Sequence, residues 1–189
     1  LLKEKIFENI WVQPAAGDAG GAIGCALFVW FDYLDNLRNI ENSNDLMNGT
    51  YLGPEFTDKE IHQYLNYNGY SYERLSDDEL PSKIADLISK NNVIGWFQGR
   101  MEFGPRALGS RSILGNAESA ATQRTMNLKI KYRESFRPFA PSIRVENIKD
   151  YFDIDVESPY MMLVAEIKKD KRKNFNEENL TGLEKLNVE

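Results

Sequence analysis

Residues 103–115 read FGPRALGSRSILG and combine the residue types of an anion-binding loop. Gly104 and Gly109 would let backbone N–H groups approach a ligand closely. Arg106 and Arg111 add guanidinium groups, whose planar set of donors suits the oxygens of phosphate or carboxylate. The pattern therefore predicts an anion site, and a turn that carries solvated charges remains the alternative.

The same loop differs from the phosphate-binding P-loop. Its glycines have a suitable separation, but Ser110 and Arg111 stand where a P-loop has its lysine and its Ser or Thr. The loop is therefore not a Walker A motif.

A second basic segment follows at residues 128–142, LKIKYRESFRPFAPS, and Glu134 is the acidic residue among its cations. Unpaired like charges repel one another, and an anionic ligand relieves that cost. We expect this segment to contribute to the anion site, with a basic patch that contacts nothing as the alternative. Arg133, and Arg100 upstream, either line the same pocket or face outward. The cations of the segment are Lys129, Lys131, Arg133 and Arg137.

Charge is distributed unevenly along the chain. The net charge of −6 combines +6 over residues 95–144 with −12 over the rest. An extended positive surface, which binders of nucleic acids and membranes need, is not expected in such a protein. The sequence has no apolar run of membrane-spanning length and no signal-peptide pattern, and its single cysteine, Cys25, fits a reducing compartment. We therefore expect a cytoplasmic globular protein with a local anion site.

The predicted strands alternate with predicted helices along the chain, and this alternation is typical of an α/β fold. Two capping-box spacings, Thr57 with Glu60 and Ser76 with Glu79, predict the starts of two helices. Further predicted elements are a helix at 117–131 and strands at 11–13, 92–99, 110–114, 142–145 and 159–167.

Three other segments define the organisation. An apolar helix is predicted from about Asp18, with glycines that indicate close backbone approach and with Cys25 packed on one face. The polar run 39–55 predicts a linker between domains. The highly charged segment 168–189 is expected to be mobile.

The motifs GWFQGRMEFGPRALGSRSIL and MNLKIKYRESFRPFAPSI resemble the C-terminal region of the carbamoyltransferase family, which includes nodulation-factor and antibiotic O-carbamoyltransferases. PAAGDAGGAIGCAL resembles the segment just upstream in the same family, so the resemblance covers about residues 5–165. It implies an actin-like ATPase-type domain followed by a YrdC-like α/β domain. In such enzymes the YrdC-like domain condenses carbamoyl phosphate with ATP to carbamoyl adenylate and releases pyrophosphate, and the actin-like domain passes the carbamoyl group to a substrate hydroxyl.

The resemblance also implies a domain division. Residues 1–45 would be the strand–helix end of the actin-like domain, and residues 46–189 a YrdC-like twisted mixed sheet with helices, truncated at its C-terminus. We expect a fragment that lacks the N-terminal actin-like half and is inactive in the overall reaction by itself. Its substrates would be carbamoyl phosphate and a small-molecule acceptor with a hydroxyl group.

The resemblance assigns roles to the basic residues. Arg106, Lys131 and Arg137 correspond to the family's ligands for carbamoyl phosphate and for the phosphate of the adenylate, which fits cations that stabilise charge developing on oxygens. ATP with Mg²⁺ is the implied nucleotide. The implied residues around substrate and nucleotide are Gly104, Gly109, Ser110, Arg111, Ser112 and Arg133.

Asp18, in PAAGDAGG, resembles the aspartate with which the family's actin-like domain ligates a divalent metal, expected to be Fe²⁺, together with histidines from an earlier part of that domain. The alternative role for Asp18 is helix N-capping. His62 is the single histidine of this chain and is interpreted as a plain helix residue.

A binding module without catalysis is the alternative function. A YrdC-like fold can present a positive concave surface to an anion or to RNA, and the +6 segment permits this. Salt dependence separates the two functions, because RNA binding weakens steeply with salt.

Overall fold

The computed structural model describes residues 1–8, 10–39, 45–172 and 181–182. Their contacts group them into two units. The first unit consists of Leu1–Phe56, Gln98–Arg111 and Ser158–Leu163, and the second of Thr57–Phe97, Ser112–Glu157 and Val164–Glu189. The boundary predicted from the sequence, between residues 45 and 46, stays a prediction.

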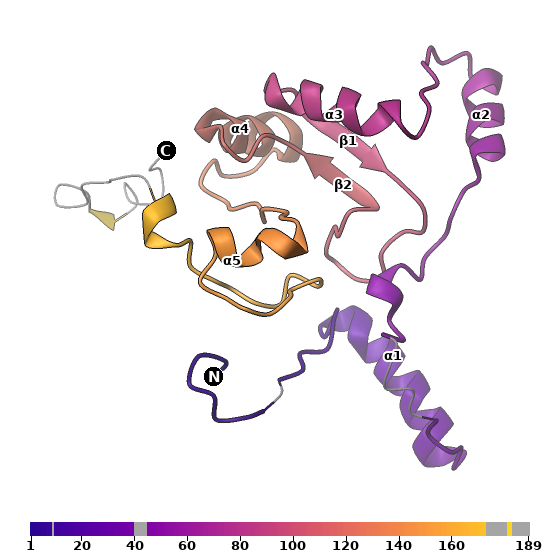
Figure 1. Ribbon diagram of the computed structural model, residues 1–189. Coiled ribbons are helices and arrows are strands. Elements are labelled where there is room, and N and C mark those ends of the chain that lie inside the picture. Colours follow the sequence, from indigo (N-terminus) through magenta and orange to yellow (C-terminus); the bar gives the residue numbers. More distant parts are fainter. Residues whose placement is uncertain (9, 40–44, 173–180, 183–189) are drawn as a thin grey trace. The chain divides into compact units, whose positions relative to one another are not determined.

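The first unit contains the predicted glycine-containing helix. Helix α1, Asp18–Phe28, follows Gly17 and continues as a π-helical turn, Val29–Tyr33 (Figure 1). A Cβ atom at Gly20 would lie 2.4 Å from the carbonyl oxygen of Ala15, so the close approach predicted from the glycines is confirmed there. Residues of α1 are not buried, and the expectation that Cys25 packs against a neighbour is wrong, because its side chain is exposed.

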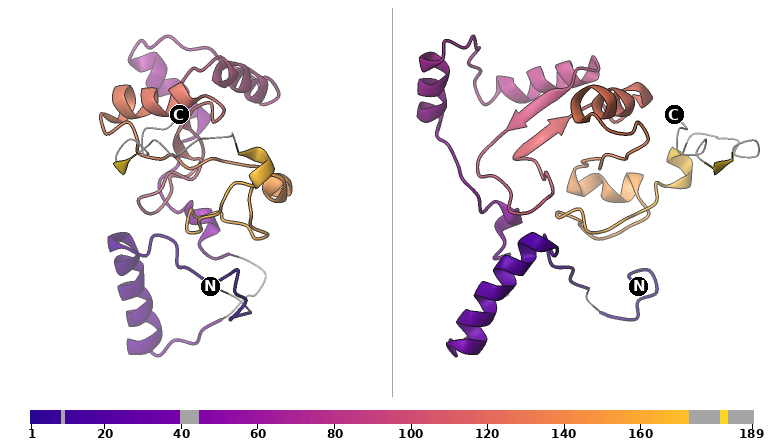
Figure 2. Two further views of the ribbon diagram at one scale, coloured as in Figure 1. Left: turned by 90° about the vertical axis from the view of Figure 1, so that its left-hand side faces the viewer. Right: turned by 180° about the vertical axis from the view of Figure 1, so that it is seen from behind.

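The second unit holds most of the regular structure. Strand β1, Ile94–Phe97, pairs antiparallel with β2, Arg111–Leu114, and α3, Glu79–Ser89, lies beside β1 (Figures 1 and 2). Helix α4, Ala120–Thr125, continues into a π-helical segment, Met126–Lys131, so the predicted helix at 117–131 is helical from residue 120 onward. The mixed α/β class is confirmed.

Local capping sets two of the helix starts, as predicted. Helix α2, Asp58–Tyr67, begins after Thr57, whose hydroxyl accepts from the N–H of Glu60 while the Glu60 carboxylate accepts from Thr57. Ser76 and Glu79 make the same reciprocal hydrogen bonds, although α3 itself begins at Glu79. These bonds lower the pKa of both glutamates, because they favour the charged carboxylate.

Three predicted strands are not strands. Residues 11–13 and 142–144 make no ladder within the described part of the chain, and Pro138 and Pro141 leave the segment before Ser142 short of backbone donors. The predicted strand 159–167 is interrupted at Met161, whose φ of 53° is incompatible with an extended chain, and only Ile167 forms a bridge, to Phe152. The sheet within the described residues is therefore two-stranded, smaller than the predicted mixed sheet.

The remaining described elements are short. They are a 3-10 turn at Asn48–Thr50, another at Val145–Asn147 that leads into α5, Ile148–Tyr151, and a third at Lys169–Lys171. The charged segment 168–189 is predicted to be mobile, and most of it lies outside the described residues. Among the described helices, none has both the length and the apolar character to cross a membrane.

Candidate functional site

The predicted anion loop, Gly104–Arg111, is organised by a buried carboxylate. Glu102 is 6% exposed, and its Oε1 accepts the backbone N–H groups of Leu108 and Ser110 at 2.7 Å and of Arg111 at 3.3 Å. Burial raises the pKa of Glu102, but the hydrogen bonds outweigh burial, so the pKa lies below the ordinary glutamate value. These three N–H groups therefore point to an internal anion and not to a ligand.

Arg111 anchors the end of the loop. Its guanidinium donates to the carbonyl oxygens of Gln98 and Gly99 at 3.1 Å, of Ser110 at 2.9 Å and of Pro54 at 3.4 Å. An arginine with these partners ties three backbone segments together, because a guanidinium carries five donors in one plane. Its predicted part in anion binding stays a prediction.

The glycines of the loop have conformations that other residues rarely adopt. The φ angle is 108° at Gly104 and 110° at Gly109. A Cβ atom at Gly104 would also lie 2.5 Å from the Cβ of Ala15. Between the two glycines, Arg106 is exposed, and it has no hydrogen bond or ion pair within the described part of the chain.

The segment after the 3-10 turn at Asn48–Thr50 supports this loop from the other side. The N–H of Phe103 donates to the carbonyl of Thr50 at 2.6 Å, and the hydroxyl of Tyr51 donates to the carbonyl of Leu108 at 2.7 Å. Gly53 donates to the carbonyl of Met101 at 2.9 Å. Residues 50–54, part of the predicted linker, are therefore packed against the loop.

The second basic segment is organised around Asn127, which is fully buried. Its amide nitrogen donates to the carbonyls of Ser135 at 2.9 Å and Arg137 at 2.8 Å, and its Oδ1 accepts from Nε of Arg133 at 2.6 Å. Arg133 also lies 4.8 Å from the ring centre of Phe139. Asn127 thus fixes the course of the chain from residue 133 to residue 137.

The predicted ligands of this segment differ in their surroundings. Lys131 is exposed, ends the π-helical segment before Tyr132, and has no hydrogen bond or ion pair among the residues described. Arg137 pairs with Glu134 at 3.0 Å, and both side chains are about half exposed. An exposed pair of this kind is worth little, so Arg137 can exchange Glu134 for another anion.

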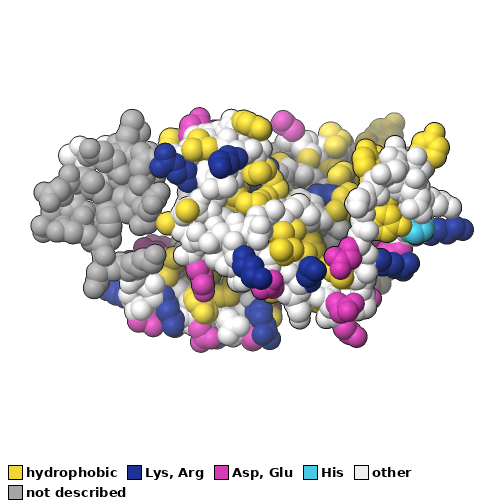
Figure 3. All heavy atoms as spheres, turned by 90° about the horizontal axis from the view of Figure 1, so that it is seen from above, with side chains coloured by type: hydrophobic (Ala, Val, Ile, Leu, Met, Phe, Trp, Pro, Cys, Tyr) yellow, Lys and Arg dark blue, Asp and Glu magenta, His cyan; other side chains and the backbone are white. Residues whose placement is uncertain are grey.

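The basic residues are better paired than the sequence predicts. Arg100 approaches Glu55 at 3.6 Å, and Arg144 pairs with Glu146, so acidic partners come from outside the +6 segment as well as from within it. Figure 3 shows basic and acidic side chains next to one another at several places on the face in view. The argument from unpaired clustered charge therefore holds for cations such as Arg106, Lys129 and Lys131, which have no hydrogen bond or ion pair among the described residues, and not for the whole segment.

Arg106 belongs to the first unit, and Lys131 and Arg137 belong to the second. Ser110 is buried and donates to Glu102, while Ser112 lies in β2. The shared site predicted for these residues stays a prediction.

Asp18 is the first residue of α1 and is exposed. Gly17 is the N-cap and the helix start has no side-chain cap, so the N-capping alternative is wrong for Asp18. No group of three His, Cys, Asp or Glu side chains in the described residues could hold a metal ion. His62 lies in α2, 2.7 Å from the Tyr72 hydroxyl and 3.0 Å from the amide nitrogen of Asn66, at the surface.

Comparison with known proteins identifies the family. The family model for the carbamoyltransferase C-terminus matches residues 85–179, half of the chain, and the model for the carbamoyltransferase N-terminus matches residues 1–27. The chain belongs to the carbamoyltransferase family. The match includes both basic segments and the helix that begins at Asp18.

Three relatives illustrate the range of the carbamoyltransferase family. An uncharacterized protein, sll1178, from Synechocystis sp. is 54% identical over 100% of this chain. Nodulation protein NolNO from Sinorhizobium fredii is 39% identical over 91% of it, and the 3′-hydroxymethylcephem-O-carbamoyltransferase of Streptomyces clavuligerus is 31% identical over 87%. The matched regions span 31%, 25% and 29% of these proteins, respectively.

Sequence reasoning missed the residues that organise the two segments. Glu102 had a signal, because it is one of three acidic residues in a strongly basic stretch. Asn127 had a weaker signal, because asparagine is a poor helix former and Asn127 lies inside a predicted helix. Thr50 had no signal at all, since it lies in a polar run typical of a linker.

Proposed function

We propose that this chain is the part of an O-carbamoyltransferase that binds carbamoyl phosphate and ATP and forms carbamoyl adenylate. In atom balance, carbamoyl phosphate, ATP and water become carbamoyl adenylate, pyrophosphate and phosphate. The carbamoyl group then passes to the hydroxyl of an acceptor. Family membership supports the reaction class, and the printed activity of the Streptomyces clavuligerus relative supports a hydroxyl acceptor.

The observation that carries the proposal is the state of Arg106. Its loop is held in place by Glu102, by Arg111 and by two glycines at positive φ, while Arg106 itself is exposed without an anionic partner in the described residues. A cation on a preorganised loop binds a phosphate oxygen at a small entropic cost. The ligand is held by side chains here, because three N–H groups of the loop already donate to Glu102.

Lys131 and Arg137 are assigned the same role in our proposal. Lys131 offers an ammonium group without a partner among the described residues, and the course of the chain up to Arg137 is fixed by the buried Asn127. Carbamoyl phosphate and ATP carry several phosphate groups between them, so more than one cation has a ligand. Mg²⁺ would accompany ATP and neutralise part of its charge.

The metal implied by the family does not fit the described residues alone. Asp18 supplies one exposed carboxylate, and the described residues form no cluster of three ligands. Asp18 is therefore proposed as one metal ligand, the others of which do not come from the described residues, and no part of the reaction assigned to this chain depends on it.

Ligand binding to the 189-residue chain tests the proposal. Isothermal titration should detect one saturable event each for carbamoyl phosphate and for ATP with Mg²⁺. Arg106→Ala and Lys131→Ala should each weaken carbamoyl phosphate binding about 10- to 100-fold, the value of one lost charge-assisted hydrogen bond. Arg74→Ala is the matched control, because Arg74 is an exposed arginine of the second unit outside the basic segments.

Absence of saturable binding, or equal binding by Arg106→Ala, Lys131→Ala and the parent chain, would refute the proposal. The RNA-binding alternative makes a different prediction for the same samples. A short single-stranded RNA would then bind more tightly than carbamoyl phosphate, with an affinity that falls steeply with salt.

A further inference from the structure

A small pocket lies beside the Arg106 loop, entirely within the first unit. Thr50, Phe103, Arg106, Leu108 and Tyr160 are among the residues that line it. Its volume of about 10 Å³ is enough for one water-sized group and no more. A ligand bound to Arg106 could therefore place one small group in the pocket while the rest of the ligand stays outside.

Thr50, one of the lining residues, has a buried hydroxyl that lacks a partner among the described residues. Thr50 is 1% exposed, and its Oγ1 makes no hydrogen bond in the described part of the chain. Buried hydroxyl groups are nearly always hydrogen-bonded, because an unmade hydrogen bond has a substantial cost in free energy. An unsatisfied hydroxyl in a pocket lining is therefore a feature that a ligand would complete.

The backbone at Thr50 is also strained. Its φ is 66°, a value that is rare for a β-branched residue, and Ala15, another lining residue, has a φ of 52°. Hydrogen bonds on both sides hold Thr50 in this conformation: its N–H donates to Met47 at 2.7 Å, and its carbonyl accepts from Phe103 at 2.6 Å. Strain that the surroundings maintain is characteristic of binding and catalytic sites.

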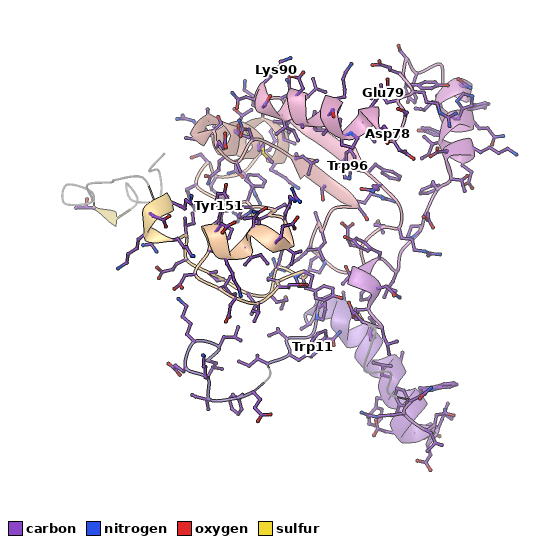
Figure 4. All side chains as sticks on the ribbon, in the orientation of Figure 1. Trp11, Asp78, Glu79, Lys90, Trp96 and Tyr151 are labelled. Atoms are coloured by element: carbon purple, nitrogen blue, oxygen red, sulfur yellow. The ribbon has the colours of Figure 1, made fainter. Side chains whose placement is uncertain are left out.

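The other lining residues offer few polar groups that could compete with Thr50 and Arg106 for a ligand. The Tyr160 hydroxyl donates to Asp45, and the Tyr160 ring meets Trp11 edge to face at 6.4 Å; Trp11 is labelled in Figure 4. Phe103 and Leu108 contribute apolar walls. The two groups left for a ligand are thus the Arg106 guanidinium, which only donates hydrogen bonds, and the Thr50 hydroxyl, which both donates and accepts.

We propose that this pocket holds the amino end of a carbamoyl group, with its NH₂ donating to Oγ1 of Thr50 and an oxygen of the same ligand accepting from Arg106. A carbamoyl group fits because its NH₂ is a small donor beside an oxygen acceptor. A phosphate group does not, because it is larger than the pocket. This inference rests on the proposed function and makes Thr50 the residue that selects a carbamoyl ligand over an acyl one.

A pair of ligands tests the inference on the 189-residue chain. Acetyl phosphate is close in shape to carbamoyl phosphate but carries a methyl group in place of NH₂. The parent chain should bind carbamoyl phosphate about tenfold more tightly, because acetyl phosphate leaves the Thr50 hydroxyl unsatisfied. Thr50→Val, which has nearly the same shape, should abolish this preference and leave acetyl phosphate binding unchanged, whereas Thr50→Ser should retain the preference.

Stability gives an independent readout. Without ligand, Thr50→Val should melt at the same temperature as the parent chain or higher, because replacing an unsatisfied buried hydroxyl with a methyl group removes a cost. A lower melting temperature would contradict the inference, since it would mean that the hydroxyl has a partner.

The outcomes separate this inference from the proposed function. Saturable binding of both ligands without preference, in the parent chain, overturns the role of Thr50 and leaves the role of Arg106 intact. Absence of binding for both ligands overturns the proposed function and this inference with it. If Thr50→Val does not fold, the parent chain and Thr50→Ser still decide, because both must prefer carbamoyl phosphate.

Discussion

Replacing Glu102 should destabilise the Arg106 loop by a predictable amount. Its Oε1 accepts two hydrogen bonds of 2.7 Å and one of 3.3 Å from backbone N–H groups. Each of the two short bonds should contribute about 1.5 kcal/mol, the low end of the range for a charged acceptor, because both share one oxygen. Glu102→Ala should therefore lower the free energy of unfolding by about 3 kcal/mol. Glu102→Gln keeps the acceptor but loses the charge, so it should cost about half as much, near 1.5 kcal/mol.

The cost of Glu102→Gln should depend on pH. The pKa of Glu102 is lower in the folded chain than in the unfolded chain, where it has the ordinary value of about 4.3. The stabilisation by its charge is therefore complete above that value and disappears as pH falls through the lower folded value. The difference in free energy of unfolding between the parent chain and Glu102→Gln should shrink over the same range.

Urea denaturation followed by tryptophan fluorescence measures both effects, at pH 7 and at steps down to pH 3. Glu118→Gln is a suitable control, because Glu118 is exposed and its side chain has no hydrogen bond or ion pair among the described residues. A cost for Glu102→Gln that stays constant from pH 7 to pH 3, or one no larger than that of Glu118→Gln, would refute the role given to the Glu102 carboxylate.

Two further substitutions test the supports of the basic segments. Asn127→Ala removes both amide donors to the carbonyls of Ser135 and Arg137, and it should lower the free energy of unfolding by about 2–3 kcal/mol in urea denaturation. Lys129→Ala, on the same helical segment, should change it little, and equal effects would contradict the account. Gly104→Ala places a Cβ at a φ of 108° and in contact with Ala15, so it should weaken carbamoyl phosphate binding by displacing Arg106. Unchanged affinity in titration would show that the loop tolerates another conformation.

Local signals in the sequence were enough to place several elements. The capping residues Thr57 and Ser76 set the starts of two helices, because the donors and acceptors of a capping box are only three residues apart. The apolar run at 92–99 and the following segment 110–114 contain the two strands, as predicted. The strand predicted at 159–167 was lost because no pattern in the sequence reveals the positive φ at Met161.

The sequence by itself determined the family and the residues able to bind an anion, because these are properties of residue type and spacing. The tertiary structure decided which of those residues are free to do so. Arg111 donates to carbonyl oxygens and Arg137 pairs with an exchangeable Glu134, whereas Arg106 has no partner among the described residues. The physical reason is twofold. Most of these partners are backbone groups, which are alike in every residue and so leave no signal in the sequence. Contacts such as that of Tyr51 with Leu108 also join positions 57 residues apart, which only the folded chain brings together.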